Sequence, residues 1–88
     1  MINVKKKSEN DFIVDVEMDG YKTTHKVHVD DDYYKKLTEG RISKEELIRR
    51  SFEFLLDRES NRTILSRFDL KVINRYFPTY ESVMKNQI

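Results

Sequence analysis

The pair Asp19-Gly20 constrains the fold of this chain more than any other feature. It divides the stretch DFIVDVEMDGYKTTHKVHVD, residues 11–30, in which apolar and polar residues alternate on both sides. Alternation with a period of two is typical of a β-strand with one buried face. Asp-Gly favours a two-residue type I′ turn, in which both residues have a positive φ. The stretch therefore predicts an antiparallel β-hairpin.

A two-residue turn also determines which residues lie opposite each other. The numbers of paired residues should sum to 39. One face of the predicted hairpin is apolar and pairs Met18–Tyr21, Val16–Thr23, Val14–His25 and Phe12–Val27. The other face sets acidic residues against basic or polar ones in Glu17–Lys22, Asp15–Thr24, Ile13–Lys26 and Asp11–His28. Turn chemistry and cross-strand pairing thus agree.

Helix signals follow the hairpin. The acidic run Asp30–Asp32 predicts the start of a short helix that ends at Gly40, since acidic side chains satisfy free amides at a helix start. The segment Ser43–Glu46 has the pattern of a capping box, with Glu46 reaching back to the Ser43 amide. The helix that it opens is expected to run to about Arg58. Its inward stripe is predicted as Leu47, Ile48, Ser51, Phe52, Leu55 and Leu56.

The C-terminal part, from Ser60 onward, predicts further short helices. A first helix would carry Ile64, Leu65 and Phe68, and a second would be capped by Asp69 and turn Ile73, Tyr76 and Phe77 inward. Pro78 should end the second helix, and Thr79 should cap a last one. The predicted fold is α+β, an N-terminal antiparallel β-hairpin packed on a cluster of about four to five helices. Residues 1–9 are expected to form a flexible tail and residues 10–88 a single domain.

Composition narrows the possible classes of protein. A chain of 88 residues has a marginal core, because small domains bury a smaller share of their surface. The absence of cysteine excludes disulfides and thiolate metal sites. No apolar run approaches the roughly 18 residues of a membrane span. The start MINVKKKSEN has no apolar segment behind its lysines, so we expect a cytoplasmic protein without membrane contact.

Neither catalysis nor metal binding is expected from these residues. His25 and His28 are three apart on a predicted strand, so their side chains point to opposite faces and cannot bind one ion. His25 is interpreted as a hydrogen-bonded core residue, and His28 should face solvent. Gly20 and Gly40, the two glycines, have turn roles, which leaves none for a phosphate-binding loop. We expect no catalytic residue, cofactor or metal.

The segment HKVHVDDDYYKKLTEGRISKEELIRRSFEFLL, residues 25–56, resembles the ribbon-helix-helix family of dimeric bacterial repressors and antitoxins. The resemblance implies a strand that pairs with its copy in a second chain and enters the major groove. Contacts with DNA would then come from the outward residues Lys22, Thr24, Lys26 and His28. The backbone amides of Ser43 and Lys44 would hold a phosphate.

The segment SFEFLLDRESNRTILSRFDLKVINRYFPTYE, residues 51–81, is similar to a group of short prokaryotic proteins of unassigned function. They share a RES…ILxxFDLxxIxxYFP pattern. The resemblance implies a compact small protein and carries no activity or site residue.

Charge favours a protein partner over nucleic acid. Residues 1–32 have a net charge of −3 and residues 33–88 one of +4. The hairpin register sets acidic residues beside the outward lysines, so few counterions would be released on DNA. Arg67, Lys71 and Arg75 are expected to lie on the solvated face of a packed pair of helices.

The edge of the second hairpin strand is predicted to be free, and a free edge is either shielded or used. The first hypothesis is a homodimeric protein-interaction module in which two copies of this edge pair. The lysine-rich N-terminal residues or another chain could cover the edge instead. The alternative hypothesis is a ribbon-helix-helix-like DNA-binding regulator or antitoxin.

Overall fold

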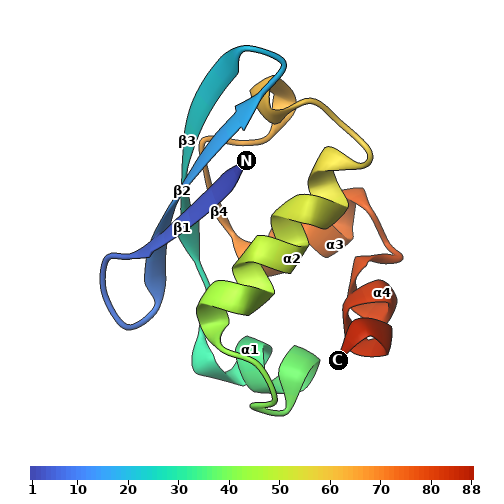
Figure 1. Ribbon diagram of the computed structural model, residues 1–88. Helices are drawn as coiled ribbons and strands as arrows, with labels where there is room; N and C mark the ends of the chain where they lie inside the picture. The colour runs from blue at the N-terminus through green and yellow to red at the C-terminus, as the bar shows by residue number, and fades with distance from the viewer.

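Residues 1–88, all described by the computed structural model, form a sheet with helices on one of its faces (Figure 1). The sheet has the strand order β1-β2-β3-β4. Its strands are β1 (Ile2–Lys6), β2 (Asp11–Met18), β3 (Tyr21–His28) and β4 (Arg67–Asp69). The first three form an antiparallel meander, and β4 lies parallel to β3. The α+β class is therefore confirmed, with a sheet of four strands and four α-helices.

The predicted hairpin is confirmed together with its register. Asp19 and Gly20 have φ values of 54° and 82°, and the pairs run from Asp11↔His28 to Met18↔Tyr21. The face that is apolar in sequence is buried at Phe12, Val14, Val16, His25 and Val27, whereas Tyr21 beside the turn is exposed. The turn type and the period of two were sufficient to place all eight pairs, because both depend on local sequence alone.

The prediction of a flexible tail at residues 1–9 is wrong for Ile2–Lys6, which form β1. This strand pairs with β2 from Ile2↔Val16 to Lys6↔Phe12. Ile2 and Val4 lie half-buried against the core. The lysines at positions 5–7 suggested a solvated segment, but the residues before them alternate as a strand does.

A helix over Ile64–Phe68 is also contradicted. The chain there forms a 3-10 helix, η1 (Asn61–Thr63), and then runs extended into β4. Phe68 faces the core, and Arg67 faces solvent. This short run has so few apolar residues that it fits the period of a helix as well as that of a strand. Its pairing with β3 decides for the strand.

Because β4 pairs with Lys26–His28 of β3, the edge that was predicted to be free is partly covered. The register of β4 leaves residues 21–25 of that edge outside the pairing. The other edge of the sheet is β1, which carries Lys5 and Lys6. Lysines on an edge strand disfavour pairing with another chain.

The two helices after the hairpin begin where their caps predict. Helix α1 (Asp31–Thr38) has the Asp30 side chain accepting from the Tyr33 amide at 2.7 Å. Helix α2 (Lys44–Leu56) has Ser43 Oγ accepting from the Glu46 amide at 3.0 Å. Glu46 does not reach back to Ser43, because it binds Arg49 and Arg50. These hydrogen bonds lower the pKa of Glu46 to about 2.

The predicted inward stripe of α2 is confirmed for five residues, which are all buried: Leu47, Ile48, Ser51, Phe52 and Leu55. Leu56 is only half-buried, and Phe54, which was not predicted to face inward, is buried. Phe54 packs edge-on against Phe77 and Tyr80, with ring centroids 6.0 and 5.4 Å apart. The C-terminal segment therefore widens the buried face of α2.

The C-terminal elements are η2 (Leu70–Val72), α3 (Ile73–Tyr76) and α4 (Tyr80–Gln87). Asp69 caps η2 by accepting from the Lys71 amide at 3.3 Å, as predicted. Thr79 makes no side-chain cap for α4, and Tyr76, which was predicted inward, is 67% exposed. Both differences concern the ends of very short helices, where periodicity is a weak guide.

Paired substitutions test whether β1 is part of the folded domain. Val4→Ser removes apolar surface from the core side of β1, so we expect a loss of about 1 kcal/mol in the free energy of unfolding. Asn3→Ser, on the neighbouring exposed residue, should change it by less than about 0.5 kcal/mol. Urea denaturation measures both. Equal, negligible effects would mean that residues 1–9 are a tail.

Candidate functional site

Four residues predicted to contact nucleic acid lie on the face of the sheet that points away from the helices. Lys22 forms an ion pair with Glu17 at 3.8 Å, and Thr24 Oγ1 donates to Asp15 at 2.8 Å. His28 Nδ1 donates to Asp11 at 2.9 Å.

Hydrogen bonds from His28 and from Ser8 lower the pKa of Asp11. Lys26 is the exception among the four, because it lies opposite Arg67 of β4. Acidic neighbours in the hairpin therefore engage three of the four residues, as the register implied.

Ser43 and Lys44, the two residues predicted to hold a phosphate, make structural contacts. Ser43 caps α2. The Lys44 ammonium donates to Asp31 at 2.5 Å, to Asn10 Oδ1 at 2.8 Å and to the Glu9 carbonyl at 3.2 Å. Only 11% of the Lys44 side chain is exposed, and its ammonium lowers the pKa of Asp31. Lys44 thus ties the turn before β2 to the start of α1.

The strand that the repressor resemblance implies as a free ribbon is an interior strand. β3 lies between β2 and β4 in the sheet. A ribbon-helix-helix protein instead pairs this strand with its copy in a second chain. This difference from the family is caused by β4, which lies outside residues 25–56, the segment that resembles it.

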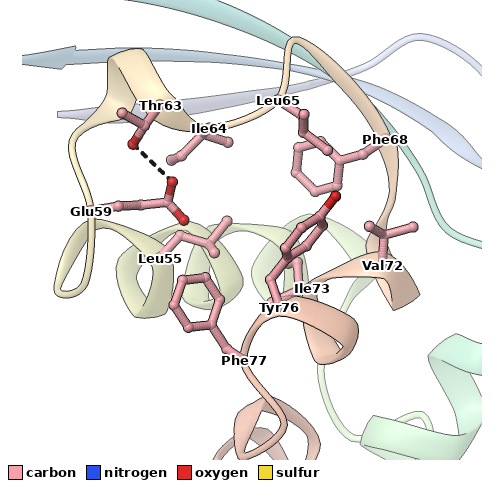
Figure 2. Close-up of a pocket in the computed structure, with 10 residues that line it drawn as sticks. All are labelled: Leu55, Glu59, Thr63, Ile64, Leu65, Phe68, Val72, Ile73, Tyr76 and Phe77. Atoms are coloured by element: carbon pink, nitrogen blue, oxygen red, sulfur yellow. Dashed lines mark hydrogen bonds between the residues drawn. The ribbon is translucent and has the colours of Figure 1, made fainter.

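A hollow lined mainly by apolar side chains lies between the segment 63–68 and α3 (Figure 2). We call it the apolar groove. Its volume is about 370 Å³, and eight of its ten lining residues are hydrophobic. The lining residues are Leu55, Glu59, Thr63, Ile64, Leu65, Phe68, Val72, Ile73, Tyr76 and Phe77.

Two large side chains at this groove are exposed to solvent. Leu65 is 47% exposed and Tyr76 is 67% exposed. Figure 2 shows the Tyr76 ring extending from α3 toward Leu65 and Phe68. Ile64, Phe68 and Ile73 belong to the buried core, so the groove is continuous with the protein interior.

A buried histidine positions the segment that carries Leu65. His25 is 2% exposed, and its Nδ1 lies 2.7 Å from the Leu65 carbonyl oxygen. Because a carbonyl only accepts, Nδ1 carries a proton and donates it, and Nε2 lies 2.8 Å from Thr23 Oγ1. The ring also packs against Phe52, with centroids 5.4 Å apart. The interpretation of His25 as a hydrogen-bonded core residue is confirmed.

Asn61 holds the other end of the same segment. Its Nδ2 donates to the Tyr21 carbonyl at 3.0 Å and to Thr23 Oγ1 at 3.1 Å. His25 and Asn61 therefore share Thr23 and connect η1 and the start of β4 to β3. This network positions Leu65 at the mouth of the apolar groove.

The polar groups of the groove are few. Glu59 Oε1 accepts from Thr63 Oγ1 at 2.8 Å (Figure 2), and the Tyr76 hydroxyl completes the set. A hollow of this kind binds apolar groups by removing them from water, and its few polar atoms orient what is bound.

The helical segment that forms one wall of the groove also carries two cationic side chains. Lys71 and Arg75 are exposed, as predicted, and neither side chain makes an ion pair or a hydrogen bond. They are the sequence neighbours of Val72 and Tyr76, which line the groove. The sequence reasoning missed Leu65 and Tyr76 as site residues because it placed both on inward helix faces.

Comparison with known protein families, with curated proteins and with solved structures found no match for this chain. No group of three or more His, Cys, Asp or Glu side chains lies close enough together to hold a metal ion. None of the helices has the length and apolar character needed to cross a bilayer.

Replacing His25 tests the network beneath the groove. His25→Leu leaves the Leu65 carbonyl without its donor, so we expect a loss of about 1–3 kcal/mol in the free energy of unfolding. The amide resonance of Leu65 should also shift. His28→Gln, on the exposed face of the same strand, should cost less than about 1 kcal/mol and leave Leu65 unchanged. A stable His25→Leu variant with native Leu65 resonances would refute this role.

Proposed function

We propose that the protein is a non-catalytic protein-interaction module and that the apolar groove is its binding surface. One observation carries the proposal: Leu65 and Tyr76 are exposed at a hollow that is continuous with the core. Contiguous exposed apolar surface on a small domain is typical of an interaction site. A partner that covers these two side chains removes apolar area from water.

The kinds of side chain at the groove suit such a role. Tyrosine is enriched among the residues that contribute most to protein-protein binding. Burial of a leucine or an aromatic side chain stabilises by about 1.5–3 kcal/mol, so two anchors supply a substantial part of the affinity of a transient complex. Both residues belong to the RES…ILxxFDLxxIxxYFP pattern, so the resemblance implies the same two residue types in that group of proteins.

Homodimer formation remains one form of this proposal, but the groove is a better surface for it than the hairpin edge. β4 pairs with three residues of the β3 edge. Lys5 and Lys6 on the β1 edge disfavour pairing with another chain. Neither edge therefore offers the long free strand on which the hairpin-edge hypothesis rested.

A DNA-binding role receives less support from the exposed sheet face. The acidic partners of Lys22 and His28 are already in place, so a phosphate would have to displace them. Binding of nucleic acid gains most of its affinity from the counterions that its cations release. Lys26 and Arg67 alone provide little of this contribution.

Site-specific photo-crosslinking in the native host tests the proposal. With p-benzoylphenylalanine in place of Leu65, we expect a discrete adduct with a polypeptide, because this side chain lies at the binding surface. The adduct should disappear when Tyr76→Ser removes the second anchor. The same probe in place of Lys22, on the outer face of the sheet, is the matched control and should give no such adduct.

The other results of this experiment separate the alternatives. An adduct of twice 10.7 kDa would identify a second copy as the partner. A nucleic-acid adduct at position 22 would support the DNA-binding alternative instead. If position 65 gives no adduct, or one that Tyr76→Ser leaves unchanged, then the apolar groove is not the binding surface.

A further inference from the structure

We infer that the occupant of the apolar groove is an acidic amphipathic helix of another protein, and that Lys71 and Arg75 bind its carboxylates. The inference rests on the proposed function and names the partner's chemistry. It is carried by the arrangement of charged and apolar side chains around the groove.

The helical turns η2 and α3 carry apolar and cationic residues at the same spacing. Val72 and Tyr76 are four residues apart and line the groove, whereas Lys71 and Arg75, also four apart, are exposed. Residues at this spacing lie on one side of a helical segment. This short helical segment therefore carries two side chains that line the groove and, one residue before each of them, an exposed cationic side chain.

The charge of Lys71 and Arg75 is not neutralised within the molecule. Elsewhere in the chain some basic side chains have carboxylate partners, as Lys36 has Glu81 and Arg50 has Glu46, whereas others, such as Lys26 and Lys85, have none. From position 58 to position 77, no basic side chain lies within 4.0 Å of a carboxylate.

The two acidic residues of that stretch have other partners. Glu59 accepts from the Thr63 hydroxyl, and Asp69 accepts from the Lys71 backbone amide. The cations beside the groove are therefore free to pair with a ligand that brings its own carboxylates.

A second copy is the less favoured occupant of the groove. A two-fold interface buries the same surface patch on both copies, so it would bring the Lys71 and Arg75 side chains of both copies to one interface. Like charges placed together across an interface oppose association. The charge of this face instead complements an acidic partner.

An amphipathic helix has the matching pattern. Its large apolar side chains, spaced at i, i+3 and i+4, enter a groove of this kind, and acidic residues beside them would reach Lys71 and Arg75. The groove volume of about 370 Å³ is near the lower end of the range of about 300–1,000 Å³ for ligand pockets. It is therefore suited to a few side chains of a larger partner.

Two synthetic peptides provide the test. Each has about 15 residues, capped ends and leucines at helical spacing, with glutamates beside the leucines in one and lysines in the other. In ¹H–¹⁵N NMR titrations, we expect the glutamate peptide to shift the amides of Leu65, Val72 and Tyr76. It should bind about tenfold more tightly than the lysine peptide, because each missing charge-assisted contact weakens binding.

Charge reversal makes the test specific. The double variant Lys71→Glu and Arg75→Glu should reverse the preference between the two peptides. The variant Lys22→Glu and Lys26→Glu makes the same change of charge on the outer face of the sheet and should leave the preference as in the wild type. Both variants change exposed side chains, and their NMR spectra report whether the fold is retained.

Each contrary result has its own meaning. If both peptides shift the groove amides equally in wild type and variant, then the groove is a docking surface, but the inferred acidity of its partner is wrong. If the groove amides shift on concentrating the protein alone, then a second copy is the occupant and the inference is overturned. If neither peptide nor concentration shifts them, the proposed function fails together with the inference.

Discussion

The parallel pairing of β4 with β3 is the interaction on which the rest of the structure depends. The Lys26 amide donates to the Ser66 carbonyl at 2.8 Å, and the His25 ring holds the carbonyl of the preceding residue, Leu65. These contacts join a C-terminal segment to the N-terminal hairpin and close one edge of the sheet. They also place Leu65 opposite α3, which creates the apolar groove. A buried hydrogen-bond network thus determines where apolar surface is left exposed.

The pairing also changes what the molecule offers to a partner. A free hairpin edge would favour self-association or a two-chain ribbon on DNA, whereas β3 inside the sheet favours neither. The surface that we propose for binding is instead the groove, where Leu65 and Tyr76 are exposed and whose helical wall also carries the exposed cations Lys71 and Arg75. The same short stretch, residues 63–76, therefore completes the fold and carries the proposed binding surface.

Local sequence was enough to predict the hairpin, its register, both helix starts and the burial of His25. Asp19-Gly20, Asp30 and Ser43 each act through hydrogen bonds or φ values within a few residues, so no tertiary information was needed. β1 and β4 could not be predicted in this way, because a strand of three to five residues is stabilised by its neighbours in space. Tyr76 was missed because α3 has only four residues. Its exposure depends on where η2 and the core place that single turn.

Amide hydrogen exchange of β3 tests the central claim most directly. The Lys26 amide donates to the carbonyl of Ser66, the residue directly before β4. The Thr24 amide points the same way by alternation along the strand but lies beyond the β4 register. We expect the Lys26 amide to exchange much more slowly than that of Thr24, because only the former is hydrogen-bonded across the sheet. Equal, rapid exchange of both would mean that the edge of β3 is free. Leu65 would then not be held opposite α3, and the apolar groove would lack one of its walls.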